Sequence, residues 1–250
     1  MRDHLKLLYV CSRVDNAIKL KSLGYINGQK GLTMSTSFQV YPTVPDIPKF
    51  TDFIKQTEKN FRAYLVKMDL DIRPKIEYQF MCIPNKSERV TQLPLPEFFI
   101  DYSKETYDTY VYYSTSVDKK GRGIIDCREM YKDHWGDNDV YIPEGFCDSG
   151  LDELFFKNYK LKRYWHFLRN AGQSATMNAL YGIAAASLAQ LTNSFIISDD
   201  GAWDYKNFPA LPDDFLEWYF VPEKTENESL RNWAEECIKL MANERYSQLP

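Results

Sequence analysis

The residues with the clearest chemical potential are isolated histidines and several groups of carboxylates. His134 lies in the segment KDHWGDND, close to Asp133, Asp137 and Asp139. A histidine nitrogen and carboxylate oxygens together can bind a divalent metal ion. The segment lacks the alternating ligands, the glycine and the distal glutamate of a calcium-binding loop. We therefore interpret it as a solvated loop and expect no metal. A hydrolase-like enzyme that uses His134 and carboxylates stays open as the alternative.

The sequence contains none of the common catalytic signatures. No Gly-x-Ser-x-Gly, Walker A or GxGxxG pattern occurs, so the sequence predicts no serine-hydrolase elbow, no nucleotide loop and no cofactor. His166 stands beside Trp165 and is interpreted as structural. The five cysteines are widely spaced and form no CxxC pair, which favours free thiols in a reducing compartment. We assign no catalytic residue, and the sequence favours a binding protein over an enzyme.

Acidic and aromatic residues gather between Asp199 and Phe220. In one interpretation the aromatic side chains pack the last helix against the core. In the other, part of the segment is an exposed face for a basic protein partner, because aromatic anchors hold an interface and acids steer the approach. The residues that we predict for this face are Asp199, Asp200, Trp203, Asp204, Tyr205, Asp213, Asp214 and Trp218.

The elements that must position these groups differ between the two halves of the chain. In the first half, apolar residues recur at three- and four-residue steps from Phe50 to Met68, which predicts a helix. Alternating, β-rich patterns predict strands around it. They cover residues 32–42, 75–83, 95–103, 108–117 and 121–130, with a hairpin turn at 118–121.

The longest stretch without a charge runs from Asn170 to Ser198. Residues 173–191 are apolar around the whole helical circumference, which is typical of a helix in the protein interior. A stripe of small residues would let another backbone come close. Polar residues such as Gln173 and Asn178 interrupt the stretch, so it is too short for a membrane span. A short strand is predicted next, in NSFIIS.

Three further helices are predicted in the second half. Residues 151–170 form an amphipathic pattern, and its basic residues scatter around the apolar face, so we expect no nucleic-acid binding. Residues 211–220 predict a short helix. The segment 225–246 predicts the last helix, with Thr225 as N-cap and Glu228 completing a capping box.

These patterns predict an α+β fold. Its N-terminal part is mainly antiparallel β with one or two helices, and its C-terminal part is mainly helical with a buried central helix. We expect one domain over residues 1–250, with 1–149 and 150–250 as alternative lobes. The net charge of −4 permits a basic partner and argues against nucleic acid. No secretory signal is evident, so we expect a cytoplasmic protein; the pattern leaves the oligomeric state open.

The C-terminal segment also resembles a known family. A small-residue helix, a short strand, an acidic Asp-Gly turn and an aromatic stretch follow each other in AAASLAQLTNSFIISDDGAWDY. This order is similar to the C-terminal half of bacterial immunity proteins, which are cytosolic antidotes that bind and block a cognate polymorphic toxin. The resemblance covers about residues 171–220 and transfers no functional residue. It implies a non-enzymatic toxin inhibitor that acts by occlusion.

Overall fold

The computed structural model of the chain describes residues 36–84, 89–100, 109–118, 120–129, 150–198, 202–204 and 207–243. The strands are β1 (Thr36–Tyr41), β2 (Ile76–Pro84), β3 (Thr91–Leu93), β4 (Thr109–Val117), β5 (Lys120–Glu129), β6 (Arg163–Arg169) and β7 (Phe195–Ile197). The helices are α2 (Phe50–Lys67), α4 (Asp152–Leu161), α5 (Ala175–Leu191), α6 (Pro212–Trp218), the short 3₁₀ helix η4 (Pro222–Lys224) and α7 (Glu228–Asn243).

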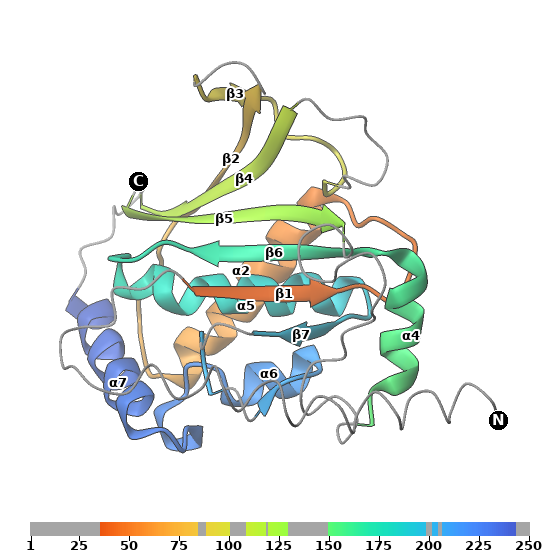
Figure 1. Ribbon diagram of the computed structural model, residues 1–250. Coiled ribbons are helices and arrows are strands. Elements are labelled where there is room, and N and C mark those ends of the chain that lie inside the picture. The colour runs from red at the N-terminus through yellow and green to blue at the C-terminus, as the bar shows by residue number, and fades with distance from the viewer. Residues whose placement is uncertain are drawn as a thin grey trace, which may run out of the picture.

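One antiparallel sheet organises the fold. Its strand order is β3-β2-β4-β5-β6-β1-β7, and every pairing is antiparallel. Figure 1 shows α2 and α5 lying across one face of the sheet, while the β3-β2-β4 end curls away from them. Strands from both sides of residue 150 pair directly, because β5 is hydrogen-bonded to β6. The fold is thus α+β, with strands prevailing in the first part of the chain and helices in the second.

Helix α5 is the centre of the molecule, as its uncharged sequence predicts. Every residue from Ala175 to Ala189 is buried. The helix contacts α2, α6 and α7 as well as β1 and β4–β7. Ser174 caps it by accepting a hydrogen bond from the Met177 amide, which satisfies one of the unpaired donors of the first turn. No helix among the described residues has the length and hydropathy needed to cross a membrane.

The predicted helix over residues 151–170 is wrong in its second half. Helix α4 ends at Leu161, Lys162 adopts a left-handed backbone with φ of 55°, and Arg163–Arg169 forms the strand β6. The segment RYWHFLR has apolar residues that fit a helical stripe, but its aromatic composition also suits a strand. Pairing with β5 on one side and β1 on the other decides the outcome.

The short elements near the C-terminus mostly match the sequence patterns. The strand β7 and the helix α6 lie where predicted. The cap of the last helix lies two residues later than predicted: Asn227 Oδ1 accepts hydrogen bonds from the amides of Ser229 and Leu230. Thr225 instead donates its hydroxyl to the Val221 carbonyl. The segment 95–100, predicted as part of a strand, holds only an isolated bridge between Phe98 and Lys49.

Candidate functional site

The predicted partner-binding residues divide into exposed, buried and undescribed groups. Asp213 and Asp214 are exposed in the first turn of α6, and Trp218 at its end is half-buried. Trp203 and Asp204 are buried, with 1% and 6% of their surface exposed, so neither forms part of the outer surface. Asp199, Asp200 and Tyr205 lie outside the described residues, as does His134, so the hydrolase-like alternative stays a prediction.

Most described aromatic residues between Asp199 and Phe220 pack inside the protein. Phe215, Tyr219 and Phe220 are almost fully buried. The Phe215 and Tyr219 rings stack at a centroid distance of 4.6 Å, and Trp203 stacks on Phe220 at 5.2 Å. The Tyr219 hydroxyl donates to the Asn178 carbonyl of α5 at 2.8 Å. These contacts fix α6 against the central helix and leave its acidic side facing outward.

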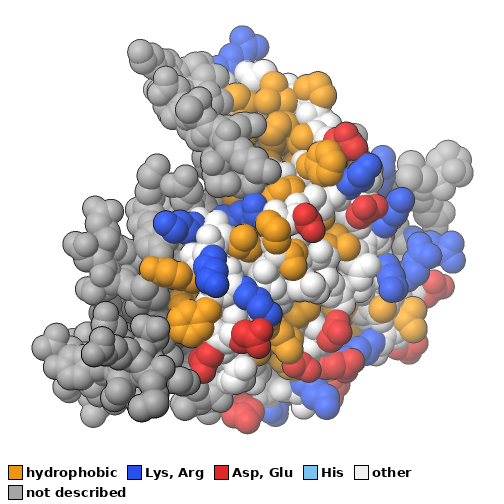
Figure 2. Space-filling model, turned by 90° about the vertical axis from the view of Figure 1, so that its right-hand side faces the viewer, with side chains coloured by type: hydrophobic (Ala, Val, Ile, Leu, Met, Phe, Trp, Pro, Cys, Tyr) orange, Lys and Arg blue, Asp and Glu red, His pale blue; other side chains and the backbone are white. Residues whose placement is uncertain are grey.

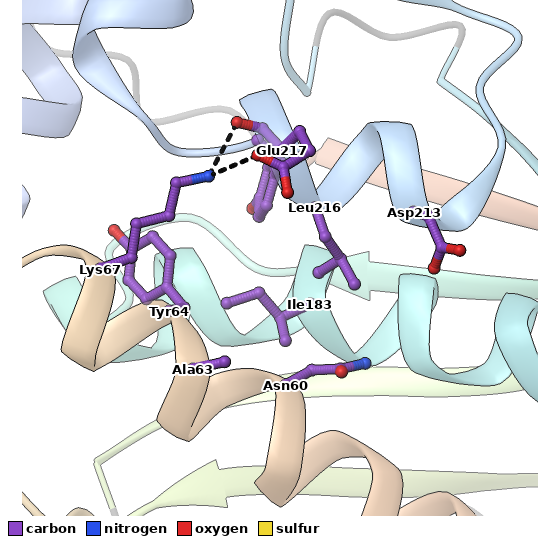
Figure 3. A pocket seen from close by; sticks show the side chains of 9 residues that line it. Asn60, Ala63, Tyr64, Lys67, Ile183, Asp213, Leu216 and Glu217 are labelled. Atoms are coloured by element: carbon purple, nitrogen blue, oxygen red, sulfur yellow. Dashed lines mark hydrogen bonds and ion pairs between the residues drawn. The ribbon is translucent and has the colours of Figure 1, made fainter.

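Asp213 and Glu217 of α6 border a cleft between α6 and α2, and Ile183 of α5 also lines it (Figure 3). The cleft has a volume of about 290 Å³. Its lining residues are Asn60, Ala63, Tyr64, Lys67, Ile183, Asp213, Leu216, Glu217 and Tyr219. The members from α2 recur at spacings of three and four residues, which places them on one stripe of the helix. Asp213, Leu216 and Glu217 have the same spacing on α6.

One end of the cleft is held by a chain of polar side chains. Asn60 Nδ2 donates to Ser187 Oγ at 2.9 Å and to Gln190 Oε1 at 2.8 Å. Gln190 Nε2 in turn donates to Asp213 Oδ1 at 2.6 Å. Gln56 Nε2 donates to the same Gln190 oxygen at 2.6 Å. The side chains of α2, α5 and α6 are therefore linked in one hydrogen-bonded series.

The other end of the cleft is closed by an ion pair. Lys67 Nζ lies 3.2 Å from Glu217 Oε2 and donates to the Glu217 carbonyl at 3.0 Å (Figure 3). The pair is well exposed, so its net contribution to stability is small. Tyr64 donates its hydroxyl to the Phe220 carbonyl at 3.1 Å, and burial raises the pKa of this tyrosine far above its ordinary value. Its hydroxyl therefore stays neutral and acts as a donor.

The negative charge of the protein is concentrated around this cleft and the following helix. Residues 207–243 hold eight acidic and three basic residues, a net charge of −5 against −4 for the whole chain. The remaining residues therefore carry a slight positive excess. Figure 2 shows more acidic side chains along the lower part of the face than along its upper part.

Comparison of the chain with protein-family models, curated proteins and solved structures gives no match. The functional interpretation therefore depends on the geometry and charge of this chain itself.

The sequence pattern predicts a helix at His166, but the structure has a strand there. It lies on β6, where its Nδ1 is 3.6 Å from Asp126 Oδ1 on the neighbouring strand β5. Both side chains are largely enclosed, with 14% and 1% exposed, so a substrate has little access to them. No group of three or more potential metal ligands gathers anywhere in the described part of the chain.

A second, larger hollow lies where the sheet curls away from α2. It has a volume of about 990 Å³, and most of its lining side chains are apolar. The lining residues are Pro45, Asp46, Ile47, Phe80, Leu93, Pro96, Glu97, Phe98, Phe99, Ile100 and Val111. Hydrophobic side chains gather on the upper part of the face in Figure 2. Nothing in the described residues defines the chemistry of an occupant.

The sequence interpretation missed the α2 side of the cleft. Asn60, Ala63 and Lys67 belong to an ordinary amphipathic pattern, and their spacing indicates only that they share a stripe. Which helix this stripe faces depends on tertiary packing, for which the sequence of α2 holds no signal. The doubled aspartate of α6 was the signal that located the opposite side.

Proposed function

We propose that this chain is a non-enzymatic protein-binding module whose α6 face, formed by Asp213, Asp214 and Glu217, binds a basic surface of a protein partner. The observation that supports this proposal most directly is the open cleft lined by the exposed acids Asp213 and Glu217, with Asp214 exposed on the same helix. Such an arrangement attracts a positively charged partner over a distance and sets its orientation as it docks.

The rigidity of α6 supports the same proposal. A helix of seven residues is too short to be stable alone, but Phe215 anchors this one in the core with no exposed surface. The acids on its outer side therefore have fixed positions before a partner arrives. Fixed positions lower the entropic cost of association.

The family resemblance of residues 171–220 supports a polymorphic toxin as the partner. In that role the chain is an immunity protein of a bacterial cytoplasm that blocks a basic toxin domain by covering it. No chemical step is required of the inhibitor, which agrees with the absence of recognisable catalytic motifs in the sequence.

The experiment combines complex isolation with a toxicity assay. The tagged full chain is purified from its native host, and the protein encoded beside its gene is co-expressed with it. We expect a stoichiometric complex and rescue of growth. The triple variant Asp213→Asn, Asp214→Asn and Glu217→Gln should lower the association rate about tenfold or more, because charge steers the encounter.

The matched control is Glu235→Gln with Glu236→Gln and Glu228→Gln on α7. It removes the same charge from exposed positions outside the α6 face, and we expect a smaller loss. Absence of any stoichiometric partner, or equal losses in the two triple variants, would overturn the assignment of this face.

A further inference from the structure

The cleft between α2 and α6 has a different chemistry at each end. At one end Lys67 already binds both the carboxylate and the carbonyl of Glu217. At the other end Asp213 receives a hydrogen bond from the neutral amide of Gln190. No described cation lies within ion-pair distance of Asp213. The Asp213 end is therefore the end at which the cleft offers an incoming cation a carboxylate that is not already paired with a described cation.

A second acceptor lies near this carboxylate. Both amide hydrogens of Asn60 are directed to Ser187 and Gln190. Its Oδ1 accepts only a long bond of 3.4 Å from Gln56, so it has capacity for another donor. Gln190 bridges Asn60 and Asp213, which keeps the two acceptors on the same side of the cleft (Figure 3).

The cleft between its two ends is apolar. Leu216 and Ile183 lie between the polar ends, and Ala63 faces them from α2 (Figure 3). Along α2 the seven residue steps from Asn60 to Lys67 correspond to a length of about 10 Å. The cleft thus offers an elongated apolar surface that leads to a pair of oxygen acceptors.

These features suit a side chain with an aliphatic stem and a cationic, multi-donor head. Arginine and lysine both have the stem, but only the guanidinium group presents several donors in one plane and can bind two acceptors at once. A guanidinium group is also more weakly hydrated than an ammonium group, which favours it in a partly enclosed site.

We propose that the cleft binds one arginine side chain of the partner, with its head on Asp213 and Asn60 and its stem on Leu216 and Ala63. This inference rests on the proposed function and names the anchor residue of that interface. Arginine is among the residues that contribute most to binding energy at protein interfaces.

The test uses N-acetyl-arginine amide as the probe and the full chain as the receptor. Side-chain amide signals of Asn60 and Gln190 are followed by NMR during the titration. We expect saturable shifts with the arginine probe and about tenfold weaker binding of the lysine and citrulline analogues. No saturable shift, or equal binding of the three probes, overturns the proposal.

Two variants and one control locate the effect. Asp213→Asn should weaken arginine binding about tenfold, while Glu235→Gln, which removes one exposed charge on α7 outside the cleft, should leave it nearly unchanged. Ala63→Phe should fill the cleft and abolish binding. Unchanged binding in Asp213→Asn with unchanged thermal stability would remove Asp213 from the site.

The failure of this inference differs from the failure of the proposed function. If the partner binds through α6 and the triple variant weakens it, but the arginine probe gives no shift, only the anchor assignment is wrong. If the probe binds and no partner does, the cleft is a guanidinium site and the proposed function is wrong.

Discussion

Arg169 is a buried cation that is held without a carboxylate partner among the described residues. It donates to Asn178 Oδ1 at 2.6 Å and to Thr36 Oγ1 at 3.0 Å. Its guanidinium group also lies 5.4 Å from the ring centroids of Tyr181 and Trp233. Two aromatic faces and two neutral acceptors thus replace the usual ion pair, and they connect β6 with α5, β1 and α7.

We expect Arg169→Lys to lower the free energy of unfolding by about 2 kcal/mol. A lysine keeps the charge but cannot donate to both acceptors or lie flat between the rings, and a hydrogen bond to a charged group contributes about 1.5–3 kcal/mol. Urea unfolding of the full chain measures the change. Arg62→Lys on the exposed side of α2 is the control, with a change below about 0.5 kcal/mol. A similarly small change in the free energy of unfolding for Arg169→Lys would contradict the predicted role of the planar guanidinium group.

At the scale of elements, α5 is closest to its neighbours where its side chains are smallest. Gly182 lies directly against the ring of Tyr219, and a β-carbon added there would overlap Tyr219 side-chain atoms. The same tyrosine is bound to Asn178 one turn earlier on α5. A single glycine therefore sets how closely the segment after α6 can approach the central helix.

Gly182→Ala should destabilise the protein by about 1–3 kcal/mol, because overpacking of a filled core forces neighbouring groups to move. The higher helix propensity of alanine offsets part of this cost. Thermal and urea unfolding give the value. In a Tyr219→Leu background the cost of the added methyl group should fall close to zero, and an equal cost in both backgrounds would show that the tyrosine is not the obstacle.

The elements were predictable from sequence where one signal dominated. The uncharged run predicts α5, the alternating residues predict β2 and the hairpin of β4 and β5, and the doubled aspartate locates the outer side of α6. The strand β6 was not predictable, because its aromatic residues fit a helical stripe as well as a strand and its pairing partners are distant in sequence. The two sides of the cleft, α2 and α6, meet only in the folded protein, through packing on α5 and through the Lys67–Glu217 ion pair.

At the scale of the whole molecule, many tyrosines are enclosed by the single sheet and its helices. Burial raises the pKa of Tyr64, Tyr78, Tyr113 and Tyr219 above the ordinary tyrosine value. A raised pKa means that the folded state keeps these hydroxyl groups protonated when the unfolded chain already ionises them. The contribution of these tyrosines to the free energy of unfolding is fully present below about pH 10, the ordinary pKa of tyrosine in the unfolded chain.

We therefore expect the free energy of unfolding to fall as the pH rises above about 10, since the unfolded state then releases protons that the folded state retains. Urea unfolding at a series of alkaline pH values measures the slope. Tyr64→Phe should make the slope shallower by the contribution of one group. A stability that stays constant through this range would argue against the burial of these hydroxyl groups.

The tight packing around α5 has a consequence for how relatives of this chain would diverge. A position that touches neighbours on every side accepts few substitutions, as the contact between Gly182 and Tyr219 illustrates. The acids of α6 face solvent, so substitutions at these positions change the stability of the fold little. Descendants of a common ancestor would therefore share the small and apolar residues of 175–191, while the exposed acids of α6 would differ more among them.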